Sequence, residues 1–400
     1  RIYKPVFHDI KNMLCGILTL TSYKNDNYGA YLQAWASKVA IERYTQNQAT
    51  VLPIEQDPFS SVLKKYPLNS GLIAAIRRKF AIKKRQKKIT RDNKNTRIQL
   101  FQDFLFRYAV QKGIHSFYYD EIEENTKDIS CFVIGSDWVW YLSDNELKKP
   151  LDNNNNKSIY FGNWDLKPNQ KRIGYAISQG IIPSFKSDIF IEACKRFSAL
   201  SFREKESITY LRDIVGIPLN IPLEHVVDPT LLLQPDDLKD IEIDTDSLTL
   251  NIKKYIVAYI LPTQDNDRIS TYISQLEHKT NIEVILINKK NEFYIKNHLI
   301  LGEKMGPREF LSMIKNAEYV VTNSFHGMVF SILYQKRFTA FSRQRNDFRQ
   351  KNLIEGLQLN DRMLDKPGVD PYNKQIDWES VMQLKNIMIK NSINYLKNNI

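Results

Sequence analysis

One histidine of this 400-residue chain has a setting suited to acid–base chemistry. The apolar run 319–321 is typical of a buried parallel strand, Ser324 follows as a candidate helix N-cap, and the apolar spacing from Met328 onward predicts a helix. His326 therefore lies beyond the carboxyl end of a strand, where open α/β sheets bind ligands, and Gly327 allows a close turn. The start of a helix favours an anion, so His326 is predicted to act as acid or base beside a phosphate or carboxylate. A helix-capping histidine without chemistry is the alternative.

An arginine occupies a comparable position after another apolar, strand-like run. Arg203 has a planar guanidinium that can bind a carboxylate or phosphate through two hydrogen bonds. The alternative is a surface ion pair with Glu204 or Glu206. Asp228 precedes a proline and is predicted to cap a turn, and His225 is assigned a structural role.

Five segments in chain order carry a family resemblance. They are NYGAYLQA at 27–34, IGSDWVW at 134–140, SFREK at 201–205, VDPTLLL at 227–233 and AEYVVTNSFHGMVFS at 317–331. They are similar to the NYGAxLQA, GSDQVW, SVRE, LDPTLLL and TDSFHGTAFS signatures of the polysaccharide pyruvyltransferase family. Each segment alone is weak, but five in the family's order are fairly specific to it.

The resemblance implies both a fold and a reaction. The expected fold is α/β, with two Rossmann-like domains that face a cleft in a GT-B-like arrangement. The implied reaction transfers pyruvate from phosphoenolpyruvate to two hydroxyls of a sugar in a bacterial surface-polysaccharide precursor and forms a cyclic ketal. His326 and Arg203 are the expected catalytic residues. No cofactor or metal is expected, because arginines and helix N-termini can hold the donor phosphate.

The donor site is expected around the histidine motif. Its predicted members are Arg203, Ser324, Phe325, His326, Gly327, Arg343, Arg345 and Lys304. Some family members read RLH at the histidine, whereas this chain has Ser324 and Phe325 before His326. Arg343 and Arg345 are therefore candidates to replace the family arginine. Lys304 is a weaker candidate, and solvent exposure is the alternative for all three.

The acceptor sugar is expected to contact two other motifs. Asn27, Tyr28 and Gly29 lie on the first strand-to-helix loop and are predicted to face the cleft. Asp137 can accept hydrogen bonds from sugar hydroxyls while Trp138 stacks on a sugar ring. A structural turn at Gly29 and a core position for the tryptophan are the alternatives.

Strands alternate with helices along most of the chain, which predicts parallel sheets. With 42% hydrophobic residues, the chain can bury a large core and form more than one domain. Residues 1–245 are expected to form the first α/β domain, with a basic helical insertion near 60–112. A linker near 234–254 leads to a second α/β domain at 246–375. The resemblance implies that the helix at 376–400 packs back on the first domain.

The net charge of +12 is concentrated in a basic block from Arg77 to Arg97, which contains a single acid, Asp92. Such a block attracts polyanions. A solvated helical arm and contact with an anionic membrane surface or a lipid diphosphate are the two main readings. Nucleic acid is not an expected partner, since no recognisable binding module accompanies the charge.

The cysteines and the hydropathy pattern bear on localisation. The three cysteines are far apart in sequence, which favours free thiols in a reducing cytoplasm. No run of about 18 apolar residues predicts a membrane span, and no Cys or His spacing predicts a zinc site. We therefore expect a cytoplasmic protein, with peripheral contact at the inner membrane face as the alternative.

Two rival functions fit the same fold. A GT-B glycosyltransferase would use a nucleotide-sugar donor, and a non-catalytic relative would only bind a glycan or lipid. Retaining glycosyltransferases often place two glutamates near the second-domain site, but Glu355 is the first glutamate after His326. Binding of phosphoenolpyruvate rather than nucleotide sugars separates these functions.

Overall fold

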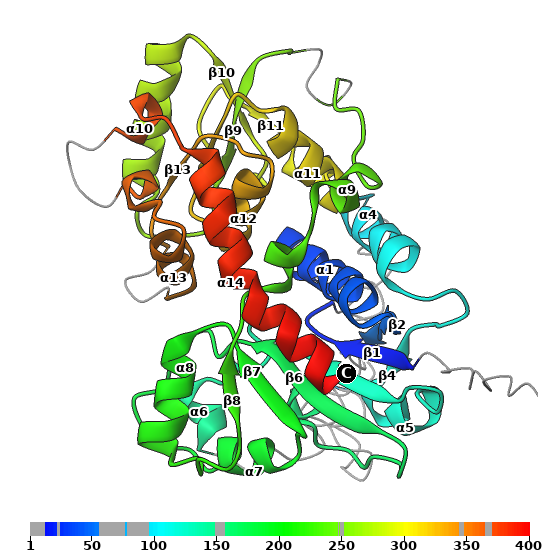
Figure 1. Ribbon diagram of the computed structural model, residues 1–400. Coiled ribbons are helices and arrows are strands. Elements are labelled where there is room, and N and C mark those ends of the chain that lie inside the picture. The colour runs from blue at the N-terminus through cyan, green and yellow to red at the C-terminus, as the bar shows by residue number, and fades with distance from the viewer. Residues whose placement is uncertain are drawn as a thin grey trace, which may run out of the picture.

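The computed structural model describes residues 13–21, 25–55, 77, 96–148, 157–246, 248, 252–343, 348–364 and 370–400. Within this part of the chain, two parallel sheets form the centres of two α/β domains, which lie one above the other in Figure 1. This is the GT-B-like arrangement that the family resemblance implied.

The sheet of the first domain has six strands in the order β2-β1-β5-β6-β7-β8. Their bounds are β1 Leu14–Leu18, β2 Gln48–Val51, β5 Cys131–Ile134, β6 Lys171–Ile177, β7 Ala199–Phe202 and β8 Leu223–His225. The sheet of the second domain has the order β11-β10-β9-β12-β13. Its strands are β9 Tyr255–Tyr259, β10 Glu283–Leu286, β11 Leu299–Ile300, β12 Tyr319–Thr322 and β13 Phe338–Ala340. A separate pair joins β3, Ile54–Glu55, to β4, Phe117–Tyr118.

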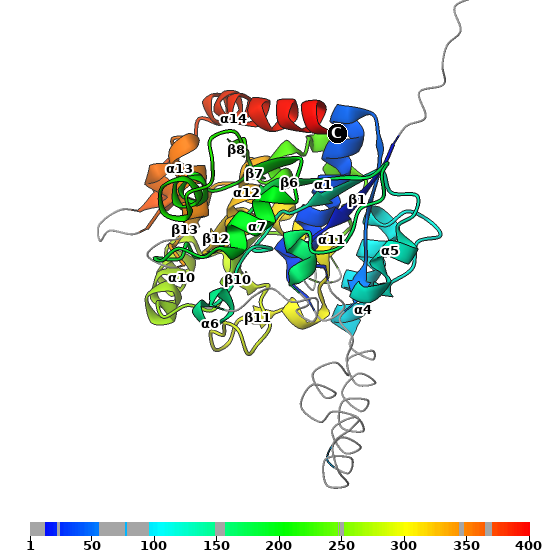
Figure 2. The same ribbon diagram turned by 90° about the horizontal axis from the view of Figure 1, so that it is seen from below.

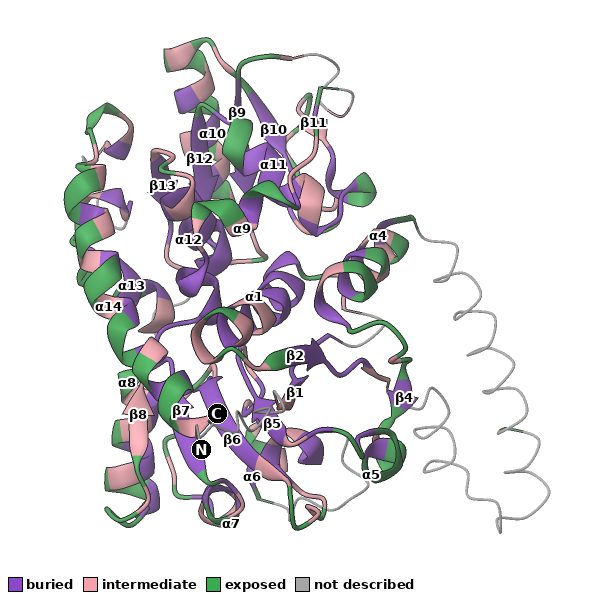
Figure 3. Cartoon of the chain, turned by 45° about the vertical axis from the view of Figure 1, so that its right-hand side comes forward, coloured by how far each residue is buried: buried purple, intermediate pink, exposed green. Residues whose placement is uncertain are grey.

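The strands are apolar on both faces because each sheet is covered on both sides. In β5, Cys131 and Val133 pack into a core that also contains residues of the second domain, whereas Phe132 and Ile134 pack into a core on the opposite face. Figure 3 shows the same burial for the central strands of the second sheet. The cysteine of β5 lies opposite Cys15 of β1, and both thiols are free and buried.

Helices connect the strands and cover the sheets. They are α1 Tyr28–Thr45, α4 Thr96–Phe104, α5 Ile122–Asn125, α6 Asp144–Leu147, α7 Ile189–Lys195, α8 Lys205–Thr209, α9 Pro235–Lys239, α10 Asn266–Thr280, α11 Pro307–Asn316, α12 Phe325–Leu333, α13 Phe348–Gly356 and α14 Trp378–Asn399. Residues 28–37 of α1 are all buried, because this helix lies between the two domains. A short helix, α9, occupies part of the acidic stretch that was expected to be a linker.

The last helix, α14, runs from the second domain back across the first, as Figures 1 and 2 show. Its Ser392 Oγ accepts a hydrogen bond of 2.9 Å from the backbone N–H of Val227. Its Tyr395 hydroxyl donates to the carbonyl of Gly174 on β6 at 2.8 Å. These bonds fix the helix on the first domain, beside β6 and the segment that follows β8.

A buried arginine links the two domains on the opposite side. Arg97 is 3% exposed, and its Nη1 donates to the hydroxyl of Tyr28 at 2.6 Å and to the carbonyl of Met305 at 3.0 Å. Its Nε pairs with Asp26 Oδ2 at 3.0 Å, and Lys289 Nζ pairs with the same oxygen at 3.0 Å. Arg97 therefore belongs to the domain contact, and its assignment to a basic surface block was wrong.

The rest of the basic block contributes little to the described structure. Arg77 is exposed, and residues 78–95 lie outside the described residues. Among the helices that the structure describes, none combines the length and apolar composition needed to span a bilayer.

Candidate active site

Arg203 follows β7 and is the centre of a buried cluster of carboxylates. Its Nη1 lies 2.6 Å from Asp228 Oδ2, its Nη2 lies 3.3 Å from Asp137 Oδ1, and its Nε lies 3.2 Å from Glu204 Oε1. Burial alone would lower the pKa of Arg203, but Glu204, Asp228 and Asp137 together raise it above its usual range. The guanidinium therefore stays charged and holds three acids of the first domain in place.

Asp228 has the turn-capping role that its sequence predicted, and it also belongs to the site. Its Oδ1 accepts hydrogen bonds from the backbone N–H of Thr230 at 3.0 Å and from the Thr230 hydroxyl at 2.6 Å. The same oxygen lies 3.7 Å from His326 Nε2. Burial would raise the pKa of Asp228, but His326, Arg203 and Thr230 lower it well below its usual range. Asp228 is therefore an anion that faces both predicted catalytic side chains.

His326 enters the first domain from the start of α12. Ser324 caps this helix and accepts a hydrogen bond of 3.3 Å from the N–H of Gly327, as its sequence predicted. The imidazole is 7% exposed and packs against Gly29 at the start of α1. A Cβ on Gly29 would lie only 2.0 Å from His326 Nδ1. The first and last sequence motifs therefore meet at this ring.

Several buried polar atoms near the carboxyl ends of β5, β6 and β7 lack a hydrogen-bond partner within the described part of the chain. They are Trp138 Nε1, both amide atoms of Gln179, Glu204 Oε2 and His326 Nε2. The other oxygen of Glu204 accepts from Ser178 Oγ at 2.6 Å. Burial raises the pKa of Glu204, and the charge of Arg203 offsets only part of that rise. Such a concentration of unpaired polar groups is typical of a site rather than of a core.

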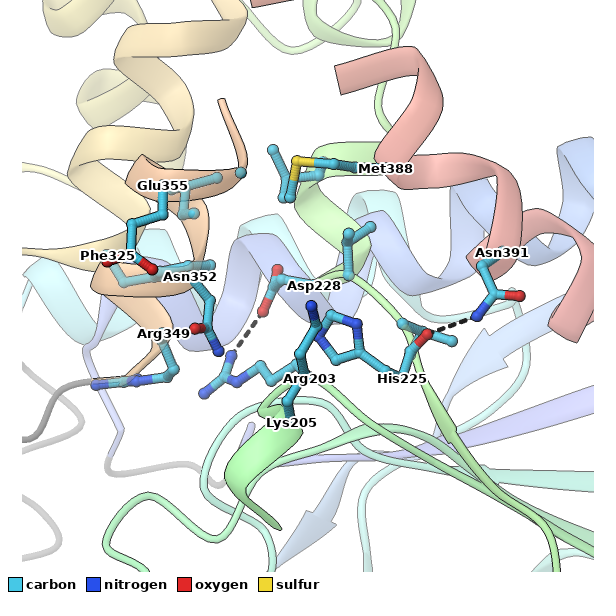
Figure 4. A pocket seen from close by; sticks show the side chains of 15 residues that line it. Arg203, Lys205, His225, Asp228, Phe325, Arg349, Asn352, Glu355, Met388 and Asn391 are labelled. Atoms are coloured by element: carbon cyan, nitrogen blue, oxygen red, sulfur yellow. Dashed lines mark hydrogen bonds and ion pairs between the residues drawn. The ribbon is translucent and has the colours of Figure 1, made fainter. Parts of the chain in front are cut away.

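A cavity of about 350 Å³ opens beside this cluster, between the first domain, α12, α13 and α14 (Figure 4). Its lining residues are Arg203, Lys205, His225, Val226, Val227, Asp228, Leu231, Phe325, Arg349, Asn352, Leu353, Glu355, Gly356, Met388 and Asn391. The lining holds three cationic side chains, Arg203, Lys205 and Arg349, and Arg203 is already paired with carboxylates. The volume is in the range of small-molecule sites, so one end of this cavity can hold a small anion.

The predicted donor residues divide into two groups. Arg203 and Phe325 line the cavity, whereas His326 lies behind Asp228 and outside the lining. Ser324 and Gly327 shape the turn, because the serine caps α12 and a Cβ on Gly327 would lie 2.4 Å from Thr322 Oγ1.

Of the residues predicted to replace the family arginine, those that the structure describes are not found in the lining of the cavity. Arg343 is half-buried and Lys304 is exposed, and neither lines the cavity. Arg345 lies outside the described residues. Arg349, which sequence reasoning did not select, lies with its guanidinium 5.9 Å from the Phe325 ring and 4.9 Å from the Trp138 ring. It joins the two domains beside the cavity.

The predicted acceptor residues are also dispersed. Tyr28 is 1% exposed, stacks on Phe310 with ring centroids 4.4 Å apart, and shares its hydroxyl with Arg97. It holds the domains together, and this burial does not support a contact with sugar. Asn27 caps α1 by accepting a hydrogen bond of 3.3 Å from the N–H of Ala30.

The third motif lies nearer the cavity. Asp137 pairs with Arg203, and Trp138 is half-buried between Gly180 and Arg349. Trp140, the other tryptophan of this motif, is a core residue that stacks on Phe161.

Lys205, His225 and Arg349 are among the cavity residues that the sequence did not indicate as ligand contacts. Lys205 directly follows the SFRE motif, so its position was a usable signal. His225 is the last residue of β8, and Arg349 lies in the first turn of α13, a helix with no motif of its own, so only the fold brings them to the cavity. Among the described residues, no three His, Cys, Asp or Glu side chains are grouped as metal ligands.

Comparison with solved structures finds distant similarity over nearly the whole chain. The UDP-GlcNAc 2-epimerase from Neisseria meningitidis bound to UDP-GlcNAc is 8% identical, with a TM-score of 0.47 and coverage of 97% of this chain and 94% of that chain. The UDP-GlcNAc 2-epimerase from Methanocaldococcus jannaschii is 14% identical, with a TM-score of 0.45 and coverage of 94% and 93%. The ADP-heptose LPS heptosyltransferase II from E. coli is 9% identical, with a TM-score of 0.39 and coverage of 94% and 98%.

A search of curated proteins found no match. A family model described as polysaccharide pyruvyl transferase matches residues 27–345, which include all five motifs, the carboxylate cluster and His326. The chain therefore belongs to the polysaccharide pyruvyl transferase family.

Proposed function

We propose that this protein transfers pyruvate from phosphoenolpyruvate to two hydroxyls of one sugar in a bacterial surface-glycan precursor, forming a cyclic ketal. Family membership supports pyruvyl transfer in general. The observation that carries the choice of donor is the cavity wall made by Arg203, Lys205 and Arg349. Phosphoenolpyruvate carries a carboxylate and a phosphate, and such groups require fixed cations.

The proposed reaction balances without an added reactant. Carbon C3 of the donor gains a proton, and C2 gains bonds to two acceptor oxygens and loses phosphate. The two acceptor hydroxyls release two protons. One balances the proton added to C3, and the other leaves with the phosphate. Because the donor charges can be neutralised by arginine and lysine, we propose that no metal is required.

Each charged group has a role in this proposal. Lys205 is exposed and forms no ion pair with any described residue, so its ammonium is available to the donor. Arg203 keeps Asp228 anionic and orients the carboxylates of Asp228 and Asp137. His326, whose Nε2 faces Asp228 Oδ1 at 3.7 Å, is the proposed acid and base.

The decisive measurement is donor binding by calorimetry, with phosphoenolpyruvate compared against a panel of nucleotide sugars. We expect binding of phosphoenolpyruvate alone, and release of inorganic phosphate only when an acceptor is also present. This release is expected to survive addition of a chelator. Turnover of a nucleotide sugar would replace the proposal with a glycosyltransferase function. Binding without turnover across an acceptor panel would favour a non-catalytic relative.

A further inference from the structure

The cavity has two chemically different ends. Its cationic end contains Arg203, Lys205 and Arg349, together with Asp228 and Phe325. The other end is formed by α13 and α14, and we call it the helical end; it contains Asn352, Leu353, Glu355, Gly356, Met388 and Asn391. Figure 4 shows Met388 and Asn391 descending from α14 toward the same space as Arg203 and Asp228.

The helical end combines an apolar floor with two amide groups and one carboxylate, that of Glu355. Leu353 and Met388 supply apolar surface, and Gly356 leaves room for the methionine, since a Cβ there would lie 2.9 Å from Met388 Cε. A methionine side chain adapts its shape to a flat apolar face.

Two amides have fixed orientations at the edge of this floor. Asn352 Nδ2 donates to Glu206 Oε2 at 3.1 Å, and Asn391 Nδ2 donates to the His225 carbonyl at 2.7 Å. Within the described residues, the amide oxygens of both asparagines accept no hydrogen bond, so they can accept from a ligand. The imidazole of His225 lines the same cavity, and burial lowers its pKa, with the charge of Lys205 acting in the same direction. A neutral imidazole has one donor and one acceptor nitrogen.

A hexopyranose ring matches this arrangement. One face of the ring presents C–H groups, while its edge presents hydroxyls that both donate and accept. Asn352 and Asn391 offer oriented acceptors, and His225 offers both functions. Of the lining residues from Asn352 to Gly356 and on α14, Glu355 is the only charged one, and its carboxylate repels an anion but accepts hydrogen bonds from hydroxyls.

We propose that the helical end is the acceptor subsite and binds one neutral hexopyranose ring, with the ring face on Leu353 and Met388. This assignment rests on the proposed pyruvyl transfer. It moves the acceptor away from Asn27 and Tyr28 and toward α14. It also explains why the ring hydroxyls would meet the donor, because both ends belong to one cavity beside Asp228.

The test is to fill the helical end with a larger side chain, so that a sugar ring can no longer enter it. Met388→Trp places an indole in the subsite, whereas Ile387→Trp adds the same group at a neighbouring position that is 61% exposed. The probes are methyl glycosides of glucose, galactose, mannose and their N-acetylated amino sugars, observed by ligand-detected NMR with phosphoenolpyruvate present. Calorimetry measures the Kd of phosphoenolpyruvate separately, and circular dichroism checks the fold.

We expect Met388→Trp to weaken glycoside binding by at least tenfold while the donor Kd changes less than twofold. Ile387→Trp should change neither. Asn391→Ala, at an exposed position, should weaken glycoside binding without altering the fold. Unchanged glycoside binding in Met388→Trp, or a donor Kd raised to the same extent, would overturn the subsite.

The same experiment separates this inference from the proposed function. If wild-type protein fails to bind phosphoenolpyruvate but binds a glycoside in a Met388-dependent way, the function is wrong and the sugar subsite stands. If wild-type protein binds phosphoenolpyruvate but none of the neutral glycosides, the subsite is wrong and the donor assignment stands.

Discussion

Gly29 of the first domain lies directly against the imidazole of His326 of the second domain, and a Cβ at this glycine would come within 2.0 Å of His326 Nδ1. On the other side of the ring, Nε2 faces Asp228 at 3.7 Å. The imidazole is thus held between two motifs that are almost 200 residues apart in sequence. Glycine is needed because no other residue leaves space for the ring.

Gly29→Ala is therefore expected to displace His326. Alanine at this helical position does not itself disfavour the helix, so the fold should persist. A misplacement of about 1 Å in a catalytic group costs about 100-fold in rate, and we expect kcat to fall by about that factor. Steady-state kinetics measure the effect. A double variant that also carries His326→Ala should be no slower than His326→Ala alone, and an additive loss would disconnect Gly29 from the histidine.

His326→Ala is expected to reduce kcat by about 10²–10⁴, the usual range for loss of a general acid or base. Donor affinity should change little, because an acid acts mainly in the transition state. The matched control is His298→Ala, which removes a histidine that contacts Glu277 far from the cavity. A near-normal rate for His326→Ala would leave this residue with a purely structural role.

Arg349 and Arg203 should respond differently to truncation. Arg349→Ala is expected to raise the Kd of phosphoenolpyruvate by about 10- to 150-fold, the loss of one charge-assisted contact. Arg203→Ala leaves Asp137, Glu204 and Asp228 without their common cation, and breaking such a buried pair costs about 3–5 kcal/mol of stability. Calorimetry measures the donor Kd of Arg349→Ala, and denaturant unfolding measures the stability of Arg203→Ala.

Arg337→Ala is the control for these variants, because its guanidinium lies over Tyr319 and Tyr372 and does not line the cavity. It should leave the donor Kd unchanged. If Arg337→Ala weakened the donor as strongly as Arg349→Ala, the assignment of Arg349 to the donor would fail.

His225 gives the stability a pH dependence of known sign. Burial, with Lys205 acting in the same direction, lowers the pKa of His225 from its ordinary 6.5. As pH falls below 6.5, the unfolded chain takes up a proton that the folded protein does not, so stability decreases. Each pH unit costs at most about 1.4 kcal/mol. His225→Gln should reduce this loss between pH 6.5 and the folded pKa, as measured by denaturant unfolding. An identical pH profile for both proteins would contradict the prediction.

Membrane contact by the basic block remains a prediction about residues outside the described structure. An anionic leaflet attracts each nearby lysine or arginine by about 1 kcal/mol, and salt weakens the attraction. Changing Lys83, Lys84, Lys87 and Lys88 to glutamate should reduce binding to anionic vesicles in a sedimentation assay. Turnover of a soluble acceptor should be unaffected. Equal vesicle binding by both proteins would refute the membrane role.

Local patterns of sequence were sufficient for most elements of the fold. The bounds of β5, β6 and β7 follow from apolar runs that are buried on both faces, and Ser324 was recognisable as a helix cap because capping depends on neighbouring residues only. The short strands β8 and β11, of three and two residues, carry too few apolar positions to show a period, so the sequence pattern alone does not locate them.

The chemistry of the site depended on tertiary contacts. Sequence motifs identified Arg203, His326 and Gly29. They did not show that Gly29 packs against His326, or that Asp228 lies between His326 and Arg203. Arg349, His225 and Met388 come from different elements and meet only when α13 and α14 pack beside β8. Sequence spacing reports which residues share an element, whereas the packing of two domains and a returning helix decides which side chains share a cavity.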